Sequence, residues 1–356
     1  MSDKKTHKQS TADKPGQTEP INTGYRRKAE PRKSADEYAG GIRQGNRVLL
    51  SKAITFIESS RPETRQFGEE ILEGCLPASG NSHRIGITGI PGVGKSTFIE
   101  AMGKHVINRR GRKPAVLAID PSSSRTGGSI LGDKTRMPFL STSERAFVRP
   151  TPSSGTLGGV ARRTRETILL CEAAGYDIIF IETMGVGQSE TAVHSMVDFF
   201  LLLMLPGAGD ELQGIKRGIM EMADLIAVNK AEQEQSASAE RAKRDYENAL
   251  SFYPPGPSGR KPSVHLCSSL ENTGIEEIWS RIETTLEKSR ENGSFSRRRK
   301  EQAKYWMHET IGQRLREQFY SSPDVKRHLG ELEKKVESGR ISSCKAAAEL
   351  LQLSKK

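Results

Sequence analysis

The stretch GIPGVGKS, residues 89–96, lies between the apolar run RIGIT and the helical pattern TFIEAMGKHVI. It matches the pattern GxxxxGK[ST] at every fixed position, with the preceding strand and following helix that this pattern requires. In such a loop the glycines let backbone N–H groups turn onto phosphate oxygens, Lys95 neutralises the β and γ phosphates, and the Ser96 hydroxyl binds Mg²⁺. The predicted nucleotide contacts of this loop are Gly89, Gly92, Val93, Gly94, Lys95, Ser96 and Thr97.

Further apolar runs recur along the chain, separated by helical stretches. Such runs are typical of a parallel sheet with right-handed crossovers and helices on both faces. The predicted fold class is therefore α/β, a P-loop NTPase with a mostly parallel central sheet, whose active site lies at the carboxyl ends of the strands. The runs are AVLAID at 115–120, DIIFIE at 177–182, DFFLLLML at 198–205, DLIAVN at 224–229 and SVHLCS at 263–268, with AFVRP at 146–150 as a possible seventh strand.

The segments on either side of this predicted sheet differ from it in composition. A polar tail over 1–35 is predicted to be disordered, since residues 1–34 carry nine Lys/Arg against four Asp/Glu and supply +5 of the net charge of +11. Helical spacing marks 36–80, the strand runs fall within 81–292, and 293–356 is helical again. We therefore predict a tail, an N-terminal helical segment, an α/β domain and a C-terminal helical arm.

The C-terminal arm carries an apolar stripe. Met307, Ile311, Leu315 and Phe319 recur every fourth residue, which places them on one side of a helix. Two interpretations remain open at this point: the stripe packs on its own α/β domain, or it docks on a second subunit.

Acids are needed near a phosphate-binding loop to hold the metal ion and to place water. Asp120 ends the run AVLAID, Asp133 lies in the loop that follows it, and Glu182 ends the run DIIFIE. Each one alone is explained equally well as a helix cap or a turn acid, but their placement after apolar strands favours a metal or catalytic role. The segment ETMG at 182–185 also has the form of the DxxG segment of G proteins, whose glycine N–H, here Gly185, senses the γ phosphate.

The segment PGAGDELQGIKRG, residues 206–218, follows a strand and combines four glycines with two acids and two cations. A plain connection between strand and helix would explain it. Asp210, Glu211 and Lys216 together near a nucleotide would also suit a mobile loop that responds to the charge of the nucleotide.

The stretch VNKAE, residues 228–232, is one methylene away from the NKxD signature with which G proteins read guanine. Asn-Lys-x-acid is common in surface loops, so these five residues alone are better explained as a polar turn. The later segment HLCSSLENTGIEEIW at 265–279, which begins with HLCSS, resembles the last base-contacting loop of G proteins and lies where VNKAE requires it. The predicted base contacts are Asn229, Lys230, Glu232, Cys267, Ser268 and Ser269.

Composition argues against several other classes of protein. No nucleic-acid-binding module is legible, and the basic clusters YRRK at 25–28 and RRRK at 297–300 are interpreted as solvated segments. The four cysteines are never spaced as CxxC, which indicates a reducing compartment and argues against a zinc site. No signal or transit peptide is recognisable, and the longest apolar run, FFLLLML, is too short to span a bilayer. We expect a cytoplasmic protein that binds no nucleic acid and does not insert into membranes.

Six segments taken in order resemble the MeaB/ArgK family, which are G-protein chaperones of adenosylcobalamin-dependent methylmalonyl-CoA mutase. The resemblance spans residues 36–350, and its second and fifth segments are far more specific than the phosphate loop. The segments are GITGIPGVGKST, AIDPSSSRTGGSILGDKTRM, RPTPSSGTLGGVA, ETMGVGQSE, PGAGDELQGIKRG and VNKAE.

The resemblance implies a homodimer joined through the C-terminal arm, and slow GTP hydrolysis that the mutase accelerates. It further implies gating of cobalamin loading or protection of the loaded mutase, GTP/GDP and Mg²⁺ as ligands, and metal or catalytic work for Asp120, Asp133 and Glu182. The family carries glutamate at the position of Glu182, but it reads NKAD where this chain has Glu232 and ETVG where it has Met184.

Other interpretations of the sequence belong to different functional classes. One is a kinase or ATPase of a lysine/arginine/ornithine transport system, for which no acceptor is identifiable. Another is a nickel-insertion GTPase, which would need the Cys/His ligand clusters that the chain lacks. A third is a nucleotide-dependent scaffold without turnover.

Overall fold

The computed structural model describes residues 33–120, 135–152, 157–183, 189–207, 217–253 and 261–353. Residues 1–32, which make up most of the predicted tail, lie outside this description. From Ala35 onward the chain forms one compact unit.

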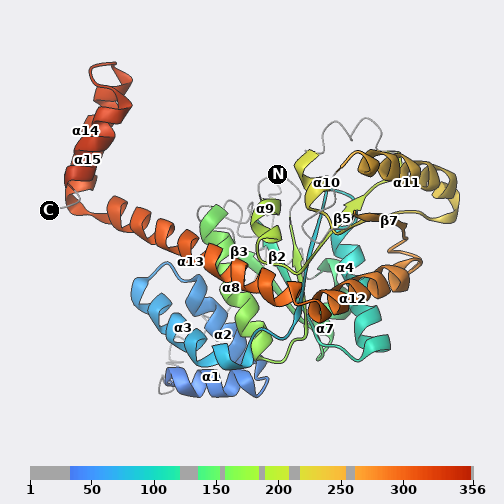
Figure 1. The fold of residues 1–356 in the computed structure, drawn as a ribbon. Coiled ribbons are helices and arrows are strands. Elements are labelled where there is room, and N and C mark those ends of the chain that lie inside the picture. Colours follow the sequence, from blue (N-terminus) through green and yellow to red (C-terminus); the bar gives the residue numbers. More distant parts are fainter. Residues whose placement is uncertain are drawn as a thin grey trace, which may run out of the picture. The chain divides into compact units, whose positions relative to one another are not determined.

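Seven strands, all paired in parallel, form the central sheet in the order β3-β2-β4-β1-β5-β6-β7 (Figure 1). The predicted P-loop α/β fold is confirmed, and AFVRP does contribute the seventh strand. Continuous apolar runs suit these strands because helices bury both faces of the sheet. The strands are β1 (His83–Gly89), β2 (Pro114–Asp120), β3 (Phe147–Pro152), β4 (Ile178–Glu182), β5 (Phe199–Met204), β6 (Leu225–Val228) and β7 (Ser263–Leu266).

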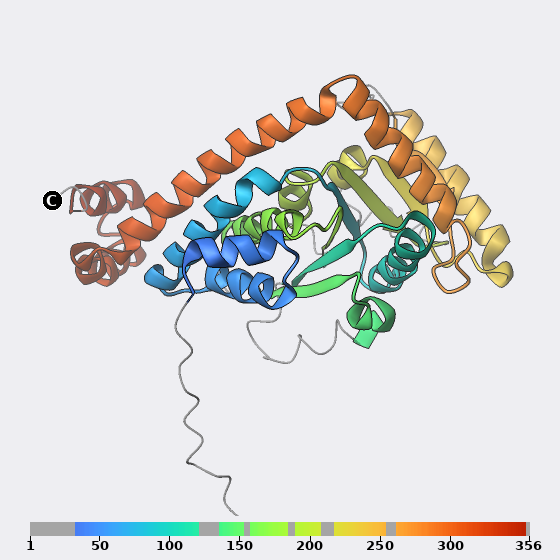
Figure 2. The same cartoon turned by 90° about the horizontal axis from the view of Figure 1, so that it is seen from below.

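Helices cover the two faces of the sheet as separate layers (Figure 2). One layer contains α4 (Lys95–Arg110), α7 (Pro138–Thr142) and α12 (Ile275–Glu291), which bury Phe98 and Trp279 against the strands. The other contains α8 (Leu157–Ala173), α9 (Ser189–His194), α10 (Arg217–Met222) and α11 (Ser236–Ser251). Two short 3₁₀ helices, η1 (Leu76–Ala78) and η3 (Gln233–Gln235), complete this part of the chain.

Three N-terminal helices, α1 (Ala35–Arg43), α2 (Arg47–Glu58) and α3 (Pro62–Cys75), pack on α8 and extend its core. The rings of Tyr38, Phe56 and Phe67 meet edge to face, with centroids 5.4–5.8 Å apart. Such aromatic contacts add to the stabilisation from burial. Arg149 of the edge strand β3 also hydrogen-bonds Ser51 on α2 at 3.2 Å.

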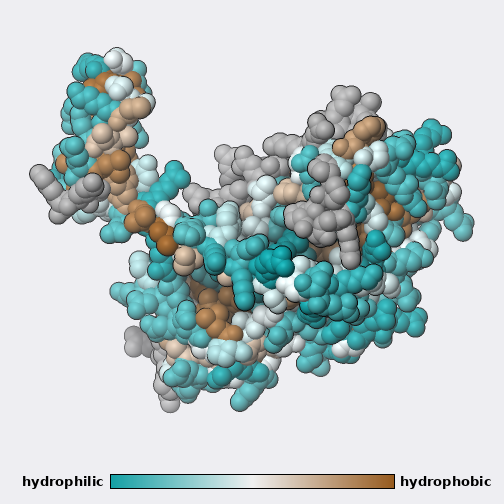
Figure 3. Space-filling view, in the orientation of Figure 1, coloured by the Kyte–Doolittle hydropathy of each residue, from teal (hydrophilic) through white to brown (hydrophobic). Residues whose placement is uncertain are grey.

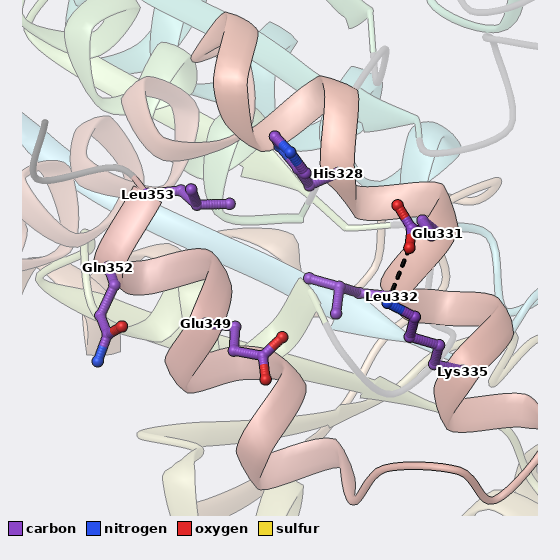
Figure 4. Close-up of a pocket in the computed structure, with 7 residues that line it drawn as sticks. All are labelled: His328, Glu331, Leu332, Lys335, Glu349, Gln352 and Leu353. Carbon is purple, nitrogen blue, oxygen red and sulfur yellow. Dashed lines mark ion pairs between the residues drawn. The ribbon is translucent and has the colours of Figure 1, made fainter.

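The C-terminal part consists of α13 (Ser294–Ser321), α14 (Pro323–Glu337) and α15 (Ser343–Leu353). α14 and α15 form a hairpin around a small core of their own, which includes Val325, Leu332 and Leu350. A cavity of about 370 Å³ lies between these two helices, where Leu332 and Leu353 point toward one another and Glu331 pairs with Lys335 (Figure 4). Among the described residues, no helix combines the length and the apolar character needed to cross a membrane.

The interpretation of the basic cluster RRRK at 297–300 as a solvated segment holds for Arg297 and Lys300, which are exposed, but is wrong for Arg299. The Arg299 side chain is largely buried and donates to Asp198 at 2.6 Å and to Ser82 O at 3.1 Å. It also pairs with Glu172, which in turn accepts two hydrogen bonds of 2.8 Å from Arg84. Burial by itself would raise the pKa of Glu172, but the two arginines lower it to about 2.

The apolar stripe predicted in the arm lies on α13. Met307, Ile311 and Leu315 are 47–61% exposed, whereas Phe319 packs against the core of α14 and α15. Trp306 faces the other way and is buried against the α/β body. Apolar surface is visible along the stretch of α13 that leads to α14 (Figure 3). The body of this protomer therefore does not cover the stripe.

Candidate functional site

The phosphate loop connects β1 to α4 at the centre of the sheet, as the sequence predicts. Gly92 and Gly94 adopt φ angles of +83° and +92°, which glycine reaches without strain. A Cβ on Gly94 would also lie 2.9 Å from the Asn229 side-chain nitrogen. This glycine is therefore required both by the turn of the loop and by its neighbour. Thr97 lies half-buried in the first turn of α4.

Lys95 is buried and bonded to its own loop. Its Nζ donates to Gly89 O at 2.7 Å and to Ile90 O at 3.1 Å. Burial lowers its pKa, while the carboxylates of Glu182 and Glu190 act in the opposite direction. The ammonium group thus lies against the carbonyls of its own loop, with the carboxylates of Glu182 and Glu190 close enough to affect its charge.

The Ser96 hydroxyl donates to Glu182 Oε1 at 2.9 Å, so two of the four predicted metal ligands are in contact. Asp120 ends β2, which pairs with β4 and places Ala118 beside Glu182. No cluster of three or more metal-binding side chains is present among the described residues. Asp133 and the side chain of Asp120, which would complete the set, lie outside them. A hydroxyl and a carboxylate oxygen side by side are a donor set that suits a hard cation such as Mg²⁺.

The segment after Glu182 is anchored at its beginning. The Thr183 hydroxyl donates to Thr88 Oγ1 at 2.7 Å, and Thr183 N donates to Ile87 O at 3.0 Å. Both threonine side chains are buried, so the strand end is rigidly held. Gly185, Asp210 and Lys216, which the sequence assigns to the site, lie outside the described residues.

Asn229 joins the predicted base-reading loop to the phosphate loop. Its Nδ2 donates to Val93 O at 2.8 Å, and its Oδ1 accepts from the Ser269 hydroxyl at 2.7 Å and from Ser269 N at 3.1 Å. The next residue, Lys230, has a φ of +62°, which is uncommon for a side-chain-bearing residue. VNKAE is thus held against both the phosphate loop and the segment at Ser269.

Glu232 lies beside the second predicted base-reading segment. Its Oε1 accepts a 2.9 Å hydrogen bond from the Ser268 hydroxyl, and Ser268 Oγ also accepts from Glu271 N at 3.0 Å. Cys267 is buried, and burial raises the pKa of its thiol to about 12. The Cys267 Sγ donates to Asn229 Oδ1 at 3.6 Å, so this thiol is part of the same polar contact.

Two buried acids escaped the sequence analysis. Glu190 on α9 lies in the segment ETMGVGQSE and acts electrostatically on Lys95, but its polar neighbours gave no reason to single it out. Glu100 accepts from Phe139 N at 2.8 Å and from Leu140 N at 3.1 Å, and so caps α7. Its position in the apolar face of α4, four residues after Ser96, was the only available signal.

Together, the fold and the site define a P-loop nucleotide-binding protein of the G-protein class. The phosphate loop, the Ser96–Glu182 contact and the loops around Asn229 lie at the carboxyl ends of the strands, where this class binds nucleotide. Comparison with known proteins then identifies the family.

The family model described as "Methylmalonyl Co-A mutase-associated GTPase MeaB" matches residues 50–324. A probable GTPase of Mycobacterium tuberculosis is 47% identical over 90% of this chain and 95% of its own length. The GTPase ArgK of Escherichia coli is 44% identical over 85% of this chain and 91% of its own. The chain therefore belongs to the MeaB family and is a GTPase.

Two further relatives carry other names. The mitochondrial methylmalonic aciduria type A homolog of Mus musculus is 42% identical over 89% of this chain and 79% of its own length. A crystal structure of a protein named LAO/AO transport system kinase is 35% identical and superposes with a TM-score of 0.71, covering 90% of this chain and 98% of that one. Both relatives are similar across nearly the whole described chain.

Proposed function

We propose that this GTPase is a chaperone of an adenosylcobalamin-dependent methylmalonyl-CoA mutase, which gates cobalamin loading or protects the loaded enzyme. The observation that carries the proposal is the match to a family described as mutase-associated over residues 50–324. The mouse relative named for methylmalonic aciduria supports the same partner. Hydrolysis is slow in the isolated protein and faster in the complex.

Guanine selectivity is assigned to Glu232. A carboxylate accepts hydrogen bonds from guanine N1–H and the 2-amino group, whereas adenine presents a bare acceptor at N1 and no 2-amino donor. Ser268 holds one carboxylate oxygen at 2.9 Å, which restrains the longer glutamate side chain. Asn229 fixes the distance of this loop from the phosphate loop.

Ser96 and Glu182, with Asp120 and Asp133, would hold Mg²⁺, which when bound neutralises charge between the β and γ phosphates. Lys95 turns from Gly89 O and Ile90 O toward the phosphates, exchanging neutral acceptors for charged ones. The backbone N–H of Gly185 senses the γ phosphate. Asp210 and Lys216, in the loop 206–218, complete the site when the partner binds.

A homodimer is proposed through the stripe of Met307, Ile311 and Leu315. Three large apolar side chains, each about half exposed on one side of a helix, favour an interface over a solvated surface. The proposed compartment is the cytoplasm.

The experiment is a measurement of GTP hydrolysis by the full-length protein, alone and with its purified mutase. We expect low basal turnover that rises when the mutase is added, and no rise with the Lys95→Ala control. Equal turnover with and without the mutase would reject the chaperone proposal.

A second candidate function is that of a transport-system kinase, which the name of the solved relative supports. Such a kinase would transfer the γ phosphoryl group of a nucleotide to a protein acceptor. Transfer of label from γ-labelled GTP or ATP to a basic-amino-acid-binding protein would favour this candidate over the chaperone.

A further inference from the structure

The first half of α13 holds the segment between α9 and β5. Three side chains on successive turns of α13 donate to four residues of this segment. Arg298 donates to His194 Nε2 at 3.3 Å and to Asp198 O at 3.1 Å, Gln302 donates to Val197 O at 2.8 Å, and Trp306 donates to Ser195 O at 3.2 Å. Residues 194–198 are therefore fixed from outside by the arm helix.

This segment is the exit of α9, the helix that follows the DxxG-like stretch. Val193 on α9 lies against β1 so closely that a Cβ on Gly86 would approach it to 2.9 Å. Glu190, one turn earlier, is buried and acts on the charge of Lys95. A shift of residues 194–198 therefore moves α9 as a whole, because a helix of six residues packed this tightly cannot bend independently.

Arg298 also lies near Asp224, two residues after the end of α10. α10 is the helix that comes after the loop 206–218, and the Asp224 carboxylate lies 4.0 Å from Arg298 Nη1. The same carboxylate accepts from Phe200 N at 2.8 Å at the start of β5. One guanidinium thus lies near the exits of two short helices, one following the DxxG-like segment and one following the loop 206–218.

The chemistry of the Arg298 contacts is directional. An arginine can only donate, so His194 Nε2 must be the acceptor and the imidazole must be neutral. Burial, and then the charge of Arg298, lower the pKa of His194 to about 4, in agreement with this tautomer. Arg299, the neighbouring residue, has a different task, since its buried ion pairs with Asp198 and Glu172 anchor α13 to the body.

The exposed stripe begins directly after the holding residues on the same helix. Trp306 faces the body and Met307 faces outward, with Ile311 and Leu315 following at intervals of four. An uninterrupted helix of 28 residues connects the two. A molecule that binds the stripe and orders α13 therefore acts on residues 194–198 through one continuous helix, without an intervening loop.

We propose that Arg298 is a positioning residue that couples the arm helix α13 to α9 and α10, so that occupancy of the nucleotide site and occupancy of the Met307–Ile311–Leu315 stripe influence each other. The proposal rests on the proposed function for the occupant of the stripe, a second copy of this chain, whereas the Arg298 contacts that carry the coupling lie within one chain. By linkage, a nucleotide that shifts the position of α9 must also change the position or the local stability of α13.

The first test uses hydrogen exchange of the full-length protein with Mg·GDP and with a non-hydrolysable GTP analogue. In the parent we expect exchange rates in α9 and in residues 298–306 to change together between the two nucleotides, by about fivefold or more. In Arg298→Ala the response of α9 should persist while that of 298–306 falls below about twofold. Lys304, exposed on the same helix and without a side-chain hydrogen bond or ion pair in the described structure, provides the control Lys304→Ala, which should behave like the parent.

Several results would overturn the proposal. One is an exchange rate in α13 of the parent that does not differ between the two nucleotides. Another is a response of residues 298–306 that survives Arg298→Ala. A third is loss of the α9 response in that variant, which would show that Arg298 only supports α9. Arg298→Lys keeps the charge but not the forked contact, and it guards against a variant that fails to fold. We expect an intermediate response from it, and a full response would refute the role of the fork.

The second test measures dimerisation of the full-length protein by sedimentation with Mg·GDP and with the GTP analogue. In the parent we expect the dissociation constant of the dimer to differ by about fivefold or more between the two nucleotides. In Arg298→Ala we expect this difference to fall below about twofold, with kcat and the KM for GTP within about threefold of the parent. A nucleotide dependence that survives Arg298→Ala would contradict the coupling. If the parent is a monomer with both nucleotides, the proposed homodimer is rejected, and the exchange experiment still decides the coupling.

Discussion

The contact between Glu232 and Ser268 leads to a double-mutant prediction about base selection. Ser268 is fully buried and donates to Glu232 Oε1 at 2.9 Å, so its removal frees a long side chain that the site needs in one rotamer. Ordering such a side chain costs up to about 1.5–2 kcal/mol. Ser268→Ala should therefore weaken GTP binding by about 1–2 kcal/mol, roughly five- to thirtyfold.

Glu232→Ala removes the acceptor itself. Loss of a charge-assisted pair costs about 1.5–3 kcal/mol, or roughly ten- to a hundredfold in GTP affinity. Because Ser268 acts through this carboxylate, Ser268→Ala made in the Glu232→Ala background should cost less than about twofold more. The cycle thus predicts a coupling energy about equal to the whole effect of Ser268→Ala.

The assay is competition binding of GTP, ATP and xanthosine triphosphate to the parent, the two single variants and the double variant. The parent should prefer GTP, and Glu232→Ala should lose most of that preference. Additive effects of the two substitutions would show that Ser268 supports the loop rather than the carboxylate. A Glu232→Ala variant that discriminates like the parent would refute the assignment of Glu232 and place base reading elsewhere.

Four other outcomes are expected. Lys95→Ala should abolish turnover, because no neighbouring cation can replace the ammonium group at the loop, and near-normal hydrolysis and affinity would reject the assignment. Lys216→Ala should keep nucleotide affinity and basal hydrolysis within about threefold but lose mutase stimulation, as checked by steady-state kinetics; unchanged stimulation would remove the loop 206–218 from the mechanism. The double substitution Ile311→Glu and Leu315→Glu should give monomers by light scattering, whereas an intact dimer would show that the interface lies elsewhere. Truncation at residue 297 is unsuitable for this test because it also removes the buried Arg299 and Trp306. Burial, and to a lesser degree Arg290, lower the pKa of His83 from 6.5 to about 4. Protonation of His83 therefore favours the unfolded chain. The stability that depends on neutral His83 is fully present above pH 6.5 and is lost as the pH falls toward 4. Between pH 7 and 4 the unfolding free energy of the parent should fall by about 3 kcal/mol more than that of His83→Gln, and equal slopes in chemical denaturation would contradict this.

The strands and the phosphate loop were predictable because their signals are local. A buried parallel strand is a short apolar run, and GIPGVGKS carries its glycines, lysine and serine at fixed spacing. The positions of VNKAE and HLCSS were predictable for a related reason, since each lies at the end of a recognisable strand. The pairing of Ser268 with Glu232 was not, because it depends on the register between β6 and β7.

The role of the RRRK cluster could not be predicted from the sequence alone. A run of four basic residues is usually solvated, and the partners of Arg299 lie about a hundred residues away at Asp198 and further still at Glu172. Which of the four side chains points inward depends on how α13 crosses the body. The exposure of each residue in the stripe could not be predicted either, since Phe319 has the same spacing as Met307 but packs against α14 and α15.

The bond between Asn229 and the phosphate loop has a kinetic consequence. Because this amide bonds both Val93 O and Ser269, it fixes the distance between the phosphate loop and the loop proposed to bind the base. A preformed site spends little affinity on ordering itself. GDP and GTP have the same base and sugar, so on the proposed assignment this half of the site should bind product and substrate equally well. We therefore expect GDP release to be a slow step of the cycle, at which a bound partner can accelerate turnover.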